Sequence, residues 1–167
     1  MLSVDMSIAS QTRAAVGEDE LLNTAVVNIY KADFSGLVRS YTYSDIPSPM
    51  YLAADEYRVD VLAGEAVAAT PEGASWDSKS YKGSQAFEIV AGQVTTVQVV
   101  ANVNNAVTKA SFDPTVAENF NEGYTLTMTL SDEAASTLVY DASKSGAEGY
   151  YIVAGLFEPS LTWTFTG

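Results

Sequence analysis

Apolar and small polar residues alternate along most of this chain. In residues 2–8, apolar side chains alternate with serine and aspartate, and in residues 161–166 leucine, tryptophan and phenylalanine alternate with three threonines. This period of two is typical of a half-buried strand, because successive side chains point to opposite faces of a sheet. The pattern predicts an all-β fold, in which Trp163 is expected to lie in a core.

Glycine, proline and asparagine separate about a dozen short apolar segments. Strands are predicted at residues 2–8, 25–30, 37–43, 50–53, 57–63, 81–90, 94–103, 106–112, 124–130, 137–141, 150–157 and 161–166. Residues 17–20 and 66–80 are predicted as loops, and only residues 114–120 and 131–136 are predicted to form helical turns. So many short strands favour Greek-key β-sandwiches, because one sheet of this size would leave an apolar face in water.

The strands divide into two sandwich modules in tandem, an N-terminal β-sandwich at residues 1–101 and a C-terminal module at residues 102–167. The second module contains fewer strands than a closed sandwich normally uses. It is therefore either a small sandwich or an incomplete one that lacks a terminal strand.

The chain is strongly acidic. Asp and Glu number 21 against 8 Lys and Arg, which gives a formal net charge of −13. Such a surface repels phosphate groups, so nucleic acids and anionic lipids are not expected as partners. No apolar run is long enough to cross a bilayer, so direct membrane insertion of this chain is not expected either.

Cysteine and histidine are absent. The commonest general base and the strongest sulfur nucleophile are therefore missing, and we predict no enzymatic activity, no catalytic residue and no cofactor. Acidic residues such as Asp132, Glu133 and Asp141 are candidates for calcium binding, but none follows a calcium-loop pattern. We expect them to be solvated, and no metal site is predicted.

Turn glycines, aromatic residues and a pair of asparagines carry a family resemblance. The segments are residues 57–64, Trp76, residues 81–83, Phe87, Gly92, residues 97–99 and residues 104–112. They resemble an uncharacterised family of exported Bacteroidales surface lipoproteins, which is similar in turn to fimbrillin-type pilins and adhesins. The resemblance implies transthyretin-like sandwiches displayed outside the cell without enzymatic chemistry. It also implies anchoring at the cell surface through sequence outside this chain.

The same resemblance draws attention to Arg13. In fimbrillin-type pilins a first strand is removed by proteolysis after an arginine, and a neighbouring subunit fills the gap. Arg13 follows the strand predicted at residues 2–8, where such a cut would fall. The alternative is an ordinary solvated arginine in a loop, which is the commoner situation.

Trp76 and Tyr81 border the longest predicted loop and are the candidate ligand contacts. Aromatic rings on sandwich loops can stack on sugar rings. The favoured alternative for Trp76 is that its ring covers the end of the sandwich, since a large aromatic side chain buries much apolar area.

The sequence therefore predicts a cell-surface protein that takes part in adhesion or in fimbriae. It is expected to act through sandwich surfaces and sheet edges. An edge strand exposes unpaired N–H and C=O groups, and an extended segment of another chain can form hydrogen bonds with them. The expected partners are other copies, related surface subunits, or host or bacterial surface glycans. The alternative is a carbohydrate-binding module that uses Trp76 and neighbouring aromatic residues.

Overall fold

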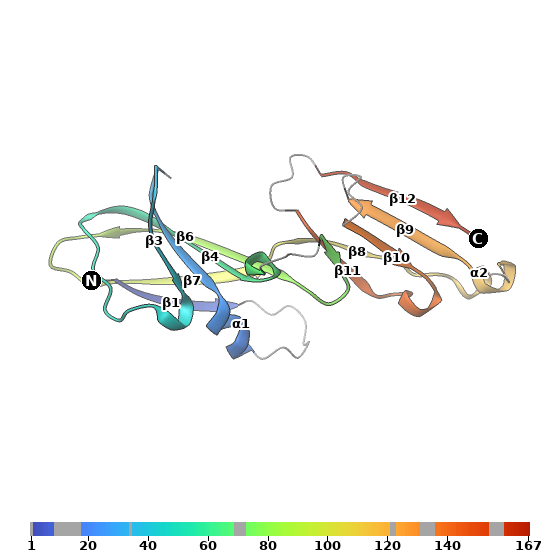
Figure 1. The fold of residues 1–167 in the computed structure, drawn as a ribbon, viewed down its shortest axis with the longest axis horizontal. Coiled ribbons are helices and arrows are strands. Elements are labelled where there is room, and N and C mark those ends of the chain that lie inside the picture. The colour runs from blue at the N-terminus through green and yellow to red at the C-terminus, as the bar shows by residue number, and fades with distance from the viewer. Residues whose placement is uncertain are drawn as a thin grey trace. The chain divides into compact units, whose positions relative to one another are not determined.

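The computed structural model describes residues 2–8, 18–33, 35–68, 73–120, 123–130, 136–153 and 159–167 (Figure 1). Internal contacts divide the chain into two units. Unit 1 comprises Met1–Ala69 and Ser80–Val103, and unit 2 comprises Thr70–Lys79 and Asn104–Gly167. Residues 73–79 thus contact the C-terminal part of the chain, although the sequence assigned them to the first module. The boundary after residue 101 stays a prediction.

Unit 1 is built around one six-stranded sheet. Its elements are β1 (Leu2–Ile8), α1 (Glu18–Thr24), β2 (Val26–Lys31), β3 (Leu37–Thr42), η1 (Tyr43–Asp45), β4 (Asp55–Gly64), η2 (Glu65–Val67), β6 (Ser80–Ile89) and β7 (Thr95–Val103). The strand order is β1-β7-β6-β4-β2-β3. Strand β1 runs parallel to β7, and the other pairs are antiparallel.

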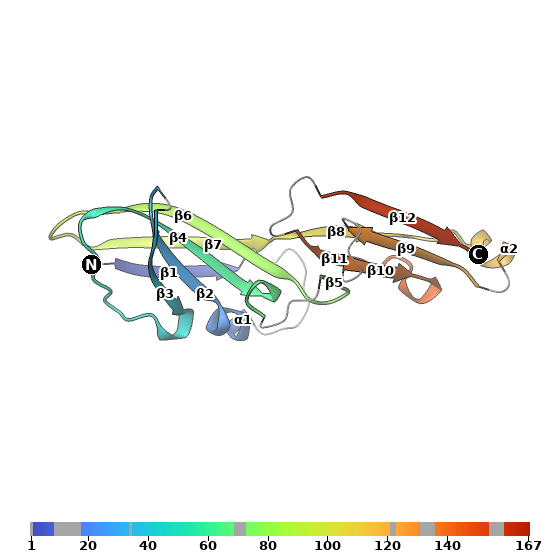
Figure 2. The same ribbon diagram turned by 45° about the horizontal axis from the view of Figure 1, so that its top comes forward.

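The core of unit 1 lies between two parts of this sheet. Strand β6 pairs with β4 along its whole length, as Figure 2 shows, but with β7 only at Tyr81 and Lys82. Beyond these two residues the β1–β7 pair diverges from β6. It lies on one side of the core, and β4 and β2 lie on the other. Every second side chain of β2, β4 and β7 is buried there: Val27, Ile29, Tyr57, Val59, Val61, Ala63, Val97, Val99 and Ala101.

Unit 2 contains two three-stranded sheets that share a core. Its elements are β5 (Ala74–Ser75), β8 (Asn105–Lys109), α2 (Pro114–Asn119), β9 (Thr125–Leu130), β10 (Thr137–Tyr140), η4 (Ala142–Lys144), β11 (Glu148–Ile152) and β12 (Leu161–Thr166). The sheets have the orders β10-β9-β12 and β5-β11-β8, and all their pairs are antiparallel. Their shared core contains Ala110, Leu130, Leu138, Tyr140 and Tyr151.

Two buried tyrosines connect the sheets of unit 2. Tyr151 of β11 donates its hydroxyl hydrogen to the carbonyl oxygen of Met128 in β9, at 3.2 Å. Tyr140 of β10 donates to the carbonyl oxygen of Thr108 in β8, at 3.0 Å. The sheet β5-β11-β8 therefore packs over β10 and β9.

The predicted all-β class and β-sandwich type are confirmed. Three local predictions are wrong. Residues 18–24 form helix α1, whose Leu21 and Leu22 pack against the unit 1 core. Residues 50–53 form no strand, although Met50 makes an isolated bridge with Leu2. Residues 74–75, inside a predicted loop, form β5.

Candidate interaction surface

Strand β12 exposes a row of large apolar side chains. Leu161, Trp163 and Phe165 are 43%, 67% and 39% exposed, respectively. Because they occupy every second position, they lie on one face of the sheet. We call these three residues the β12 apolar row. The prediction that Trp163 lies in a core is wrong.

Exposure increases across the sheet from β10 to β12. Trp163 pairs with Met128 of β9, which in turn pairs with Leu138 of β10. Leu138 is buried, Met128 is half-buried against the core, and Trp163 is largely exposed. The side chains of these three residues share one apolar face, and the sheet β5-β11-β8 covers the part at β10 and β9. The β12 apolar row is the part of this face that stays exposed.

The opposite face of the same sheet carries threonines. Thr162, Thr164 and Thr166 of β12 pair with Thr129, Thr127 and Thr125 of β9. The Thr162 hydroxyl donates to the carbonyl oxygen of Thr129 at 3.3 Å, and the hydroxyl groups of Thr129 and Thr137 are 2.8 Å apart. β12 is thus apolar on one face and hydroxyl-bearing on the other.

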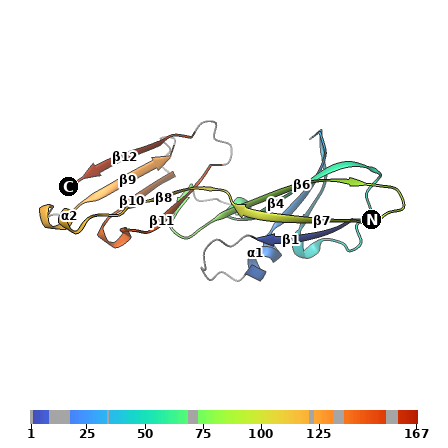
Figure 3. The same ribbon diagram turned by 180° about the vertical axis from the view of Figure 1, so that it is seen from behind.

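Among the described residues, β12 pairs only with β9, so it forms an edge of its sheet (Figure 3). An edge strand presents backbone N–H and C=O groups that a further strand can pair with. Proteins commonly protect such edges with charges, bulges or short strands. β12 has six residues, no charged side chain and no proline.

The other edge strands of the described sheets have at least one of these protections. β1 contains Asp5, β3 contains Arg39 and faces an irregularity in β2, and β8 contains Lys109. β5 and β10 are only two and four residues long. β12 is therefore the edge best suited to pair with another strand.

Helix α2 supports one end of the β12 apolar row. The ring of Phe120, the C-cap residue of α2, meets the ring of Phe165 edge-on with centroids 5.3 Å apart. At the other end of the helix, the Asp113 carboxylate accepts hydrogen bonds from the backbone N–H and the hydroxyl of Thr115. These bonds lower the pKa of Asp113 and keep its carboxylate charged.

The structure places Trp76 and Tyr81 in different units. The Trp76 ring packs edge-on against Tyr140, with ring centroids 4.7 Å apart, and the Lys144 amino group lies 4.9 Å from its centroid. Tyr81 is half-buried against the core of unit 1, and this burial raises the pKa of its hydroxyl. Arg13 lies outside the described residues, as do Asp132 and Glu133.

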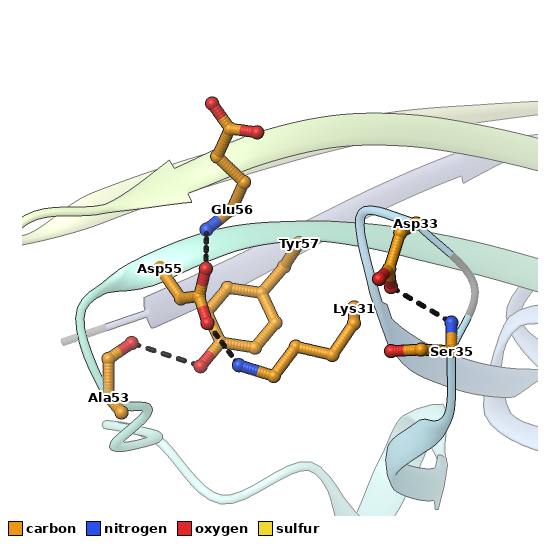
Figure 4. Close-up of polar contacts among 7 residues, drawn as sticks. All are labelled: Lys31, Asp33, Ser35, Ala53, Asp55, Glu56 and Tyr57. Carbon is orange, nitrogen blue, oxygen red and sulfur yellow. Dashed lines mark hydrogen bonds and ion pairs between the residues drawn. The ribbon is translucent and has the colours of Figure 1, made fainter.

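A second feature is an open hollow in unit 1, lined by Lys31, Ala32, Asp33, Ser35, Asp55 and Glu56. Figure 4 shows the Lys31 amino group donating to the Asp55 carboxylate. The same amino group lies 4.8 Å from the centroid of the Tyr57 ring. The hydrogen bond raises the pKa of Lys31 and lowers that of Asp55, so both groups remain charged.

Two of the three carboxylates of this hollow, those of Asp33 and Asp55, accept hydrogen bonds from within the chain. Asp33 accepts from the Ser35 backbone N–H at 2.9 Å, and Asp55 also accepts from the Glu56 backbone N–H at 2.8 Å (Figure 4). The Tyr57 hydroxyl donates to the Ala53 carbonyl oxygen at 3.0 Å. These contacts stabilise the β2–β3 turn and the start of β4, and they make the hollow a structural feature.

The described residues contain no group of three or more acidic side chains arranged to hold a metal ion. None of their helices has both the length and the apolar character that crossing a bilayer requires.

A protein-family model described as "Domain of unknown function (DUF4493)" matches residues 1–167. A comparison of the sequence with curated proteins finds no match.

The chain is similar to several solved structures. One is described as a "putative adhesin from Bacteroides ovatus", with a TM-score of 0.51 and 8% identity over 98% of this chain and 71% of the other. A second is described as "putative polysaccharide binding proteins (DUF1812)" from Bacteroides thetaiotaomicron, with a TM-score of 0.48 and 9% identity over 99% and 70% of the two chains. A "fimbrial assembly protein" from Parabacteroides distasonis gives a TM-score of 0.43 and 14% identity over 90% and 80%. The first of these shows a shared fold, and the predicted resemblance to Bacteroidales surface proteins is confirmed at that level.

Proposed function

We propose that this chain, which belongs to the DUF4493 family, is a non-enzymatic cell-surface protein that takes part in adhesion or in fimbriae. It acts through its sheet edges and sandwich surfaces, and β12 is the edge that meets a partner. Its fold, shared with a protein described as a "putative adhesin", supports this role.

The observation that carries the proposal is the combination of features on β12. The strand is an edge among the described residues, it has no charged side chain, and it exposes Leu161, Trp163 and Phe165. An added strand would pair with the backbone of β12 and cover part of the β12 apolar row. Backbone pairing and alternating side-chain contacts are the basis of recognition by strand addition.

A non-enzymatic role follows from the chemistry that the chain has available. It contains no histidine and no cysteine. In the hollow at Lys31, the lysine and two of the three carboxylates already bind partners within the protein. Recognition by shape and backbone pairing requires no reactive side chain.

The proposed location is the cell surface, with anchoring through sequence outside this chain. The proposed partners are other copies or related surface subunits.

Processing after Arg13 stays a prediction. It is tested by treating the folded protein with an arginine-specific protease, and a cut at Arg13 that leaves assembly unchanged would count against it.

The alternative partner is a surface glycan bound through Trp76. Its ring packs against Tyr140 and beneath Lys144, which leaves less of it available for stacking on a sugar. A glycan array with the wild-type protein, Trp76→Ala and Trp163→Ala separates the possibilities. Loss of binding only in Trp76→Ala supports the alternative.

The main proposal is tested by displaying the chain on cells and measuring their attachment and the assembly of surface subunits. Trp163→Lys places a charge in the middle of the β12 apolar row and should abolish both activities. The matched control is Leu37→Lys on β3, because Leu37 is also an exposed apolar residue at a sheet edge, 55% exposed. This variant should behave as wild type. Equal activity of the wild type and Trp163→Lys would overturn the role of β12, and substrate turnover by the purified protein would overturn the non-enzymatic role.

A further inference from the structure

From the sequence and register of β12 we infer that its partner is the β12 strand of a second copy, paired antiparallel about a two-fold axis at Trp163. This inference rests on the proposed use of β12 as an interaction edge, and it names the partner. Such a contact uses the same patch on both subunits, which is the usual geometry of a symmetric dimer.

The pattern of β12 is symmetric about Trp163. In an antiparallel pair centred there, Trp163 lies opposite Trp163 of the second copy, Leu161 opposite Phe165, and Thr162 opposite Thr164. Directly opposed residues in a sheet lie on the same face. The apolar rows of the two copies therefore join on one face, and the threonine rows join on the other.

Other registers fit less well. A shift by one residue would place apolar side chains opposite threonines and turn one copy's apolar row to the wrong face. A two-fold axis at Thr164 leaves Leu161 opposite Gly167, and an axis at Thr162 leaves Phe165 opposite Pro159. Only the axis at Trp163 gives all three apolar residues an apolar partner.

Charge also favours a second copy at this edge over the others. The chain has a net charge of −13, so two copies repel one another. Like charges placed close together across a strand pair add to that cost. Self-pairing of β12 opposes no charges, whereas β1, β3 and β8 each contain a charged residue.

The dimer would also extend the apolar face. Trp163 already continues the row formed by Leu138 and Met128. Pairing of two β12 strands joins two three-stranded sheets into one sheet of six strands, with the exposed ends of both apolar faces in contact. Each β12 apolar row then covers part of the other, because directly opposed side chains contact one another on that face.

Cysteine cross-linking tests the register directly, because the chain contains no cysteine of its own. Single cysteines are introduced at each position of 161–165, and the purified proteins are mildly oxidised. Opposed residues have Cβ atoms about 4.5–5.5 Å apart and diagonal neighbours about 7–8 Å, so Trp163→Cys should form at least about tenfold more linked dimer than the other four variants. Arg39→Cys on β3 is the matched edge control and should form no disulfide-linked dimer, because β3 does not take part in the proposed contact.

Replacing Trp163 removes part of the contact, so a second pair of variants is needed. An equimolar mixture of Leu161→Cys and Phe165→Cys chains should cross-link with each other, while neither does so alone. Light scattering of the wild-type protein should show a mass that increases with concentration from one to two chains. A strictly monomeric wild type, or cross-linking that is greatest at Thr164 or Thr162, would overturn the inference.

These results are separable from the test of the proposed function. A monomeric wild type whose surface assembly still fails in Trp163→Lys refutes self-pairing and retains β12 as an edge for another subunit. A dimer linked at position 163 without any effect of Trp163→Lys on attachment or assembly supports self-pairing and refutes the role of β12 in adhesion.

Discussion

Tyr140 contributes to the core of unit 2 through both its ring and its hydroxyl. The residue is fully buried and its ring meets Trp76 edge-on. Its hydroxyl lies 2.6 Å from the Thr108 hydroxyl and donates to the Thr108 carbonyl oxygen. A strand residue that reaches the backbone of the facing sheet fixes the distance between the two sheets.

Tyr140→Phe should therefore destabilise unit 2 while preserving its fold. Loss of the hydroxyl removes the bonds to Thr108, and we expect the free energy of unfolding to fall by about 1 kcal/mol. Both tryptophans of the chain lie in unit 2, so urea unfolding followed by tryptophan fluorescence reports on this unit. The control is Tyr51→Phe at a tyrosine that is 75% exposed, and equal stability of the two variants would contradict the prediction.

Gly83 of β6 permits close packing in unit 1. A Cβ atom at this position would lie 2.6 Å from the Val100 carbonyl oxygen and 2.9 Å from a Val99 side-chain carbon. Gly83→Ala therefore forces the backbones of β6 and β7 apart, and we expect a loss of about 1–3 kcal/mol in the free energy of unfolding, measured by calorimetry. A Cβ atom at Gly36 would meet no atom within 4 Å, so Gly36→Ala should leave the stability unchanged. A neutral Gly83→Ala would show that the strands adjust at no cost.

Trp163 shows what a sequence can reveal about a single residue. Trp163 lies on a clearly alternating strand, and alternation correctly predicts that it shares a face with Leu161 and Phe165. Alternation identifies the face of a strand, whereas burial depends on whether a second layer reaches it. At Trp163 that layer stops short, and only the three-dimensional arrangement of β5-β11-β8 shows this.

Short elements depend on individual side-chain caps. The 3₁₀ helix η4 follows Asp141, whose carboxylate accepts hydrogen bonds from the Ser143 N–H at 2.8 Å, the Ser143 hydroxyl at 2.6 Å and the Lys144 N–H at 3.1 Å. The bonds from Ser143 and Lys144 lower the pKa of Asp141 in the folded state. The charged cap is therefore part of what stabilises the connection from β10 to β11.

The lowered pKa gives a pH dependence with a definite sign. The cap contributes stability above the unfolded-state pKa, about 3.9, and this contribution is lost as pH falls through the lower folded-state pKa. Asp141→Ala should therefore have a lower Tm than wild type at pH 7, and the difference should shrink as pH falls below about 4. Asp141→Asn keeps an acceptor that does not titrate, so its Tm should exceed that of Asp141→Ala by a constant margin. A wild-type advantage over Asp141→Ala that is the same at pH 7 and at pH 2 would contradict this account.

At the level of elements, long alternating strands were predictable and short or context-dependent elements were not. Strands β2, β4, β6, β7 and β9 follow apolar periodicity closely. Helix α1 was missed because its residues are mainly polar and only Leu21 and Leu22 pack against the core. The two residues of β5 carry no local signal, since their pairing with β11 is set by residues far away in the sequence.

The candidate surface was only partly predictable. The sequence predicted a strand at residues 161–166 and drew attention to sheet edges in general and to the second module as a possible incomplete sandwich. It could not rank the edges, because the order of strands in a sheet depends on long-range pairing. With the order known, the absence of charge on β12 distinguishes this edge from β1, β3 and β8.

At the level of the whole molecule, the net charge of −13 opposes association of two copies. Salt screens this repulsion: the Debye length falls from about 30 Å at 0.01 M to about 8 Å at 0.15 M ionic strength. The proposed contact at β12 consists of apolar contacts and backbone hydrogen bonds, and salt should weaken these interactions little. Dimer formation should therefore strengthen when NaCl is raised over this range, as measured by sedimentation or light scattering.

Two variants of equal net charge provide the comparison. Trp163→Lys and Leu37→Lys both change the net charge to −12, from −13 with one added positive charge. Leu37→Lys should dimerise with the salt dependence of the wild type, because β3 does not take part. Trp163→Lys should remain monomeric, since its two lysines would lie opposite each other at the two-fold axis. Association that weakens with salt would instead indicate contacts between opposite charges, and it would contradict an interface made by β12.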